Sequence, residues 1–195
     1  MPYQQHEAWD YFPTRLSLKM IMAPFSVIRD FFDQEVDIVD ARKELKYWWR
    51  SAFSEQCLLE KAELVSLIGF RDQLLTIVEA SCLIPVIVEE MITMEDADML
   101  NSANFCGHQH EGYTPWDYFP RHLSKKEYVN PQLMLSKFFA YKTLPEWRDV
   151  LEELFSAAIS DCSIYTCTSD EDILKTCEYV MKLVEALYLL KVRKG

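Results

Sequence analysis

Glycine and proline are scarce in this sequence, which has four glycines and eight prolines in 195 residues. A fold of many strands and tight hairpins needs more of both, because glycine supplies the positive φ angles of hairpin turns. Helix is therefore the expected structure. The four glycines also lie far apart, so the glycine-rich loops that cradle phosphates are absent. We expect no nucleotide hydrolysis.

Long hydrophobic runs are lacking too. The longest, Cys82 to Val88, has seven residues and contains Pro85, whereas a membrane-spanning helix needs about 20. No basic stretch followed by an apolar one marks a signal peptide near the start. The six cysteines are irregularly spaced without a Cys-x-x-Cys pair, which is typical of reduced thiols. We expect a cytoplasmic protein that does not bind membranes.

Positive charge is the third shortage, with 20 Lys and Arg against 31 Asp and Glu and a net charge of −11. Nucleic acids and anionic membranes are bound by clustered Lys and Arg, so neither is expected as a direct partner. Half of the residues are hydrophobic and 26% are charged, as in ordinary globular proteins. A protein partner of neutral or basic character is favoured.

Apolar residues recur at steps of three and four along most of the chain, which predicts amphipathic helices. Pro145 fits the first turn of one of them. The pattern predicts an all-α fold with six main helices, over residues 24–33, 39–53, 57–84, 131–141, 145–160 and 170–194.

One five-residue motif occurs twice. Trp9-Asp10-Tyr11-Phe12-Pro13 recurs 107 residues later as Trp116-Asp117-Tyr118-Phe119-Pro120. Further along, at an offset of 106, Arg42 matches Arg148 and Glu79 matches Glu185. The sequence therefore predicts an internal duplication, with helical repeat one at 5–89, an acidic connector at 90–108 and helical repeat two at 109–195. We expect these two tandem three-helix repeats to form one helical bundle with pseudo-two-fold packing.

The repeated motif has two interpretations. Its aromatic side chains and carboxylate resemble an anchor for a peptide or a cationic side chain. The favoured alternative is structural: the rings cover neighbouring helices, while Asp10 and Asp117 accept hydrogen bonds from nearby backbone amides. The candidate partner-binding residues, including two further tryptophans, are Trp9, Asp10, Tyr11, Phe12, Trp48, Trp49, Trp116, Asp117, Tyr118 and Phe119.

Trp48 and Trp49 are adjacent on a predicted helix, so they cannot both point into one core. One of them should lie at an interface. Contact between the two repeats is the favoured explanation, and a site for an external partner is the alternative.

Metal ligation is a weaker hypothesis. His6, Glu7 and Asp10 are spaced for one helix face, but their counterparts His110, Glu111 and Asp117 have a different spacing. Cys106, His108 and His110 offer three ligands without a second cluster at a zinc spacing. We assign no metal, no cofactor and no catalytic residue, and leave open whether these last three bind a metal.

Two functional hypotheses follow. The first is a non-catalytic protein–protein interaction module, an inhibitor or adaptor of another macromolecule. The alternative is a small helical enzyme or metal-dependent hydrolase, which requires His6, Glu7, Asp10, His110 and Asp117 to converge between the repeats. Mimicry of nucleic acid ranks third because no long acidic run is present. A homodimer is left open.

Overall fold

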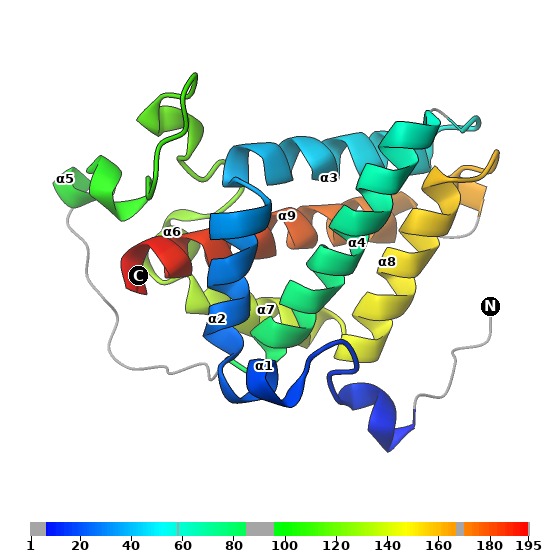
Figure 1. The fold of residues 1–195 in the computed structure, drawn as a ribbon, viewed down its shortest axis with the longest axis horizontal. Helices are drawn as coiled ribbons and strands as arrows, with labels where there is room; N and C mark the ends of the chain where they lie inside the picture. Colours follow the sequence, from blue (N-terminus) through cyan, green and yellow to red (C-terminus); the bar gives the residue numbers. More distant parts are fainter. Residues whose placement is uncertain (1–6, 58, 85–95, 167–169, 195) are drawn as a thin grey trace.

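A computed structural model describes residues 7–57, 59–84, 96–166 and 170–194 of the chain (Figure 1). His6 and residues 90–95 of the predicted connector lie outside these ranges. Every regular element within them is helical, which confirms the all-α prediction. No helix in the described ranges combines the length and the apolarity that crossing a membrane requires.

The predicted main helices are present, and their ends differ from the predicted ones by at most four residues. Glu60 and Glu63 form a capping box, so the helix expected from Cys57 begins at Lys61. The helix that begins at Pro24 continues beyond Asp30 as a π-helical turn, η2 (Phe31–Glu35). The six helices are α2 (Pro24–Asp30), α3 (Ile38–Phe53), α4 (Lys61–Cys82), α7 (Gln132–Tyr141), α8 (Leu144–Ala158) and α9 (Asp170–Lys194).

Several short helices were not predicted, because one turn is too short to show a hydrophobic period. Two of them have serine caps: Ser17 accepts a hydrogen bond from the amide of Met20, and Ser124 accepts one from the amide of Glu127. The short elements are η1 (Ala8–Tyr11), α1 (Leu18–Met22), α5 (Asp96–Met99), η3 (Ser102–Asn104), η4 (Pro115–Asp117), α6 (Lys125–Val129) and η5 (Ile164–Thr166).

The helices of the two halves pack against one another. Helix α3 has its most extensive contact with α8, and it also packs on α9, while α4 packs on α8. Within each half, α2 lies against α4 and α7 lies against α9. In Figure 1, α4 and α8 run side by side, and α3 crosses the view above α9. Buried side chains from both halves form a single hydrophobic cluster, so one core supports the site described below.

Trp48 lies inside this core. Its side chain is 0% exposed, and its ring lies 6.4 Å from the rings of both Phe70 on α4 and Phe155 on α8. Trp48 therefore joins side chains of the two halves, and its prediction as a partner-binding residue is wrong, because the helices α4 and α8 cover it. Trp49, the next residue along α3, is half-buried.

Candidate functional site

Both copies of the repeated motif form a short 3-10 turn that its own aspartate caps. The amide of Glu7 donates to Oδ2 of Asp10 at 2.8 Å, and the amide of Thr114 donates to Oδ2 of Asp117 at 2.8 Å. The hydrogen bond from the Thr114 backbone lowers the pKa of Asp117. The predicted hydrogen bonds from nearby backbone amides to both aspartates are therefore confirmed.

An arginine from α8 holds the backbone of the first motif. Arg148 donates from Nη1 to the carbonyl oxygen of Asp10 at 2.6 Å and from Nη2 to that of Phe12 at 2.7 Å. Its Nε donates to Oε1 of Glu79 on α4 at 2.8 Å. Glu79 also accepts from Oγ1 of Thr14 and from the amide of the next residue, Arg15. Arg148 and Glu79 thus hold the end of the turn and the residues that follow it.

The second motif is held in the same way by Arg42 of α3. Arg42 donates to the carbonyl oxygens of Asp117 and Phe119 at 2.7 and 3.0 Å. Its Nε donates to Oε1 of Glu185 on α9 at 2.9 Å. Each arginine therefore reaches the motif and the glutamate of the other half of the chain.

Glu185 is fully buried and has five hydrogen-bonding contacts. Besides Arg42, it accepts from the amides of Arg121 and His122, and it lies 3.0 Å from Nδ1 of His122. Burial alone would raise the pKa of this carboxyl group, but the hydrogen bonds from His122 and the positive charge of Arg42 outweigh it and lower the pKa. Glu185 is therefore held in its ionised form.

These arginines and glutamates match between the halves of the sequence, but their pairing is not predicted from it. The signal was present, because Glu79 and Glu185 are each flanked by Val and Ala, within mostly apolar stretches of their helices. A charged residue repeated at such a position points to a buried ion pair, since an unpaired charge there is too costly. The partners themselves lie too far along the chain to be read from local spacing.

The two motif copies differ in how much of them reaches the surface. In the first copy, Trp9, Tyr11 and Phe12 are all exposed. In the second, Trp116 is exposed and Phe119 is half-buried.

Tyr118 belongs to the core. It is 1% exposed, donates to Oδ2 of Asp37 at 3.0 Å and accepts from the amide of His110 at 2.9 Å. The prediction of Tyr118 as a partner-binding residue is therefore wrong, because the segment that precedes the motif, residues 106–113, covers it.

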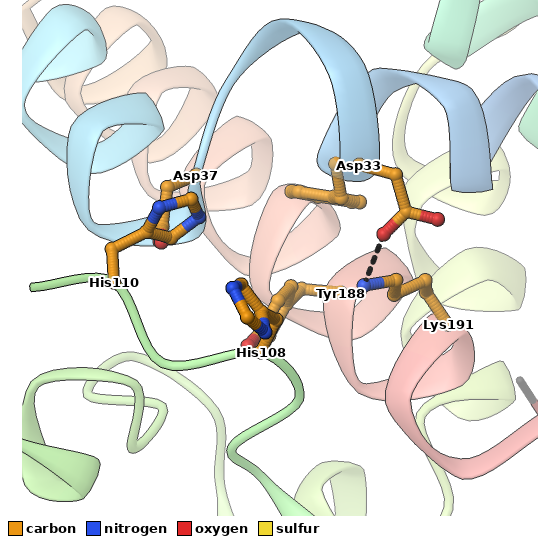
Figure 2. Close-up of a pocket in the computed structure, with 7 residues that line it drawn as sticks. Asp33, Asp37, His108, His110, Tyr188 and Lys191 are labelled. Carbon is orange, nitrogen blue, oxygen red and sulfur yellow. Dashed lines mark ion pairs between the residues drawn. The ribbon is translucent and has the colours of Figure 1, made fainter.

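A pocket of about 300 Å³ lies where this segment meets α9 and the start of α3 (Figure 2). Figure 2 shows Asp33 paired with Lys191 at one side of the pocket and His110 beside Asp37 at the other. The first pair has an N–O distance of 2.6 Å, and Nε2 of His110 lies 3.3 Å from Oδ2 of Asp37. Both carboxylates that line the pocket are therefore already partnered.

Four of the residues that line this pocket are not repeated in the other half of the sequence. At the same sequence offsets, the positions of Asp33, Asp37, Tyr188 and Lys191 are occupied by Ala140, Thr143, Cys82 and Pro85. The polar lining is thus specific to one side of the molecule. Contacts beside the pocket hold the 106–113 segment against the helices. One of them is the hydrogen bond from the amide of Gly107 to the hydroxyl of Tyr188, at 3.2 Å.

The residues that the enzyme hypothesis requires make separate contacts, each with a different partner. Asp10 and Asp117 cap their own turns, and His110 contacts Asp37. In Figure 1, η1 lies at the lower right and the segment that begins at α5 lies at the upper left. Within the described ranges, no three His, Cys, Asp or Glu side chains are placed to hold a metal ion. His6, the remaining residue of that hypothesis, lies outside these ranges.

Comparison of the chain with protein-family models, with curated proteins and with solved structures found no match. No relative therefore supplies a substrate, a partner or a site for this protein. The contacts and the exposure of its own residues are the basis for the function proposed below.

Proposed function

We propose that this chain is a non-catalytic module that binds another protein, as an inhibitor or an adaptor, through the first motif. The binding residues are Trp9, Tyr11 and Phe12, with Asp10 shaping the turn. One observation carries the proposal: three large aromatic side chains are exposed on a turn whose backbone is firmly held. Contiguous exposed apolar side chains of this kind are typical of interaction sites.

The energetics of binding favour such a surface. Trp and Tyr are enriched among the residues that dominate protein interfaces, because each buries a large area with few rotatable bonds. Since Arg148 already fixes the carbonyl groups of Asp10 and Phe12, a partner need not order this backbone. The turn is therefore preorganised for binding.

The net charge of −11 supports a partner that is neutral or basic, and it opposes nucleic acids and anionic membranes. The cytoplasm is the proposed location, on the basis of the irregular spacing of the six cysteines.

The proposal includes two tandem three-helix repeats, packed about a pseudo-two-fold axis. The two arginine anchors support it, because Arg42 and Arg148 occupy matching positions and make matching contacts. The helix contacts support it too. If α2, α3 and α4 are exchanged for α7, α8 and α9, the contact of α2 with α4 becomes that of α7 with α9, and the contact of α3 with α9 becomes that of α8 with α4. The α3–α8 contact is then the one that lies on the axis.

The interaction is tested by placing an aromatic photo-crosslinking amino acid, which keeps a ring in place of that of Trp9, at position 9 in cells, and identifying adducts by mass spectrometry. Position 65 on α4 is the matched control, because Val65 is also an exposed apolar side chain. We expect one adduct with another protein at position 9 that is reproduced with the purified partner and is lost in Phe12→Ala. If position 9 gives no adduct beyond position 65, the proposed function is wrong.

A further inference from the structure

The second motif already binds an aromatic side chain, that of Phe105. The Phe105 ring is 0% exposed. It stacks on Trp116, with ring centroids 5.5 Å apart at 29°, and it meets Phe119 edge-on at 5.0 Å and 85°. These are the two arrangements that aromatic rings prefer. Trp116 and Phe119 together therefore form a site for one aromatic ring.

The first motif contains the same pair of rings in a similar arrangement. The centroids of Trp9 and Phe12 are 5.8 Å apart at 41°, and those of Trp116 and Phe119 are 6.0 Å apart at 56°. Both pairs stand on turns whose carbonyl groups are held by an arginine. The ring pair is thus formed in both places, whether or not a third ring is bound.

The difference lies in what covers the pair. Trp9 is 77% exposed and Phe12 is 60% exposed. Among the described residues, no ring other than that of its neighbour is paired with either of them. Within the described part of the chain, no ring fills the site in the first motif that Phe105 fills in the second.

The segment that carries Phe105 shows which backbone fits such a site. Residues Ser102–Asn104 form the short helix η3, capped by Asn101, whose Oδ1 accepts from the amide of Ala103. Arg193 donates from Nε to the carbonyl oxygen of Asn104 at 3.0 Å. The aromatic residue therefore follows directly after one tight turn.

We infer that the Trp9–Phe12 pair binds an aromatic side chain, of the phenylalanine type, on a short turn of the protein partner. This inference rests on the proposed function and names the chemistry that the partner must offer. A second copy of this chain is a poor source of that side chain, because its own Phe105 is buried. A cationic side chain is disfavoured too, since the Asp10 carboxylate already accepts the Glu7 amide.

The test uses the purified full chain and a fluorescently labelled peptide with the sequence of residues 98–108, in which Cys106 is replaced by Ser. Binding is measured by fluorescence anisotropy. We expect saturation with a Kd below about 1 mM. Replacing the peptide's phenylalanine by Ala, or Trp9 of the chain by Ala, should weaken binding at least about tenfold, as expected for an anchor residue. Val65→Ala, at another exposed apolar position, should leave binding unchanged.

The other outcomes overturn the inference. Equal binding of a peptide with Lys in place of Phe would assign the site to cations. Undiminished binding to the Trp9→Ala chain would place the peptide elsewhere, for example on Trp116 and Phe119. A change of oligomeric state in Trp9→Ala, measured by analytical ultracentrifugation, would make a second copy the occupant.

The two proposals fail separately. If no peptide binds but position 9 still crosslinks to another protein, the aromatic occupant is wrong and the interaction function stands. If neither is observed, both are wrong. Circular dichroism of Trp9→Ala and Phe12→Ala should match that of the unaltered chain, because neither side chain belongs to the core.

Discussion

Arg148 on α8 lies with its Nη2 only 2.6 Å from Oε1 of Glu79 on α4. The Glu79 side chain is fully buried and that of Arg148 is mostly buried. The same guanidinium group also donates hydrogen bonds to the carbonyl oxygens of Asp10 and Phe12. One side chain therefore neutralises a buried charge and positions the exposed motif.

Replacing this arginine should destabilise the fold strongly. Arg148→Met leaves Glu79 buried without its counter-charge, and such losses cost about 3–5 kcal/mol. The free energy of unfolding is obtained from urea denaturation monitored by circular dichroism. Adding Glu79→Leu to Arg148→Met should recover part of the loss, because the unpaired charge is then gone. A loss below about 1 kcal/mol in the single variant would contradict the structural role of the pair.

Arg15 provides the matched control. Its guanidinium group pairs with Asp72 and Glu152, and all three side chains are substantially exposed to solvent. Exposed pairs contribute about 0–1 kcal/mol. Arg15→Met should therefore leave the free energy of unfolding nearly unchanged. Comparing the free energies of unfolding of Arg148→Met and Arg15→Met therefore separates the effect of burying an ion pair from the effect of having one.

The second ion pair makes stability depend on pH. The pKa of Glu185 is lowered from its ordinary value of 4.5, so the folded protein holds this carboxylate ionised more strongly than the unfolded chain does. The stabilisation is complete above pH 4.5 and is lost as pH falls through the lowered pKa of the folded state. Unfolding at pH 7, 5, 4 and 3 should show a steeper loss in the unaltered chain than in Glu185→Gln. Parallel curves for the two proteins would show that Glu185 does not contribute to the pH dependence of stability.

The helices and the location of the motif residues could be predicted to different degrees. The helix of residues 170–194 shows eight apolar residues at helical spacing, and its bounds are confirmed. The starts of other helices depended on caps such as Glu60 with Glu63, whose effect is local but easily overlooked in an acidic sequence. Periodicity thus identified the long helices, and capping corrected their ends.

Exposure of the motif could not be predicted, because it depends on distant segments. Tyr11 and Tyr118 are identical residues in identical five-residue contexts, yet the first is exposed and the second is buried. Tyr118 is covered because His110 and Asp37 bind its hydroxyl group. For Trp48 and Trp49, the sequence required that one should face away from the core, but the partners that bury Trp48 come from α4 and α8.

A comparison of two tryptophans tests which of them belongs to the core. Trp48→Ala should lower the free energy of unfolding by about 3–5 kcal/mol, because it leaves a large cavity among buried rings. Trp9→Ala should change it by no more than about 0.5 kcal/mol, because its side chain is exposed. If Trp48→Ala does not fold, Trp48→Phe should show a smaller loss in thermal unfolding. Equal effects at positions 9 and 48 would contradict this structure.

The thiols should differ widely in reactivity, because only the thiolate is a nucleophile. Burial raises the pKa of Cys82 to about 11 and that of Cys177 to about 12 from an ordinary value of 9.0. At pH 8 this lowers the thiolate fraction about a hundredfold for Cys82 and about a thousandfold for Cys177. Cys57 and Cys162 are exposed and should be alkylated first. Peptide mapping by mass spectrometry after brief iodoacetamide treatment measures each site separately, and unfolding in guanidinium should abolish the difference. Alkylation of Cys177 in the folded protein as fast as that of Cys162 would show that α9 does not bury it.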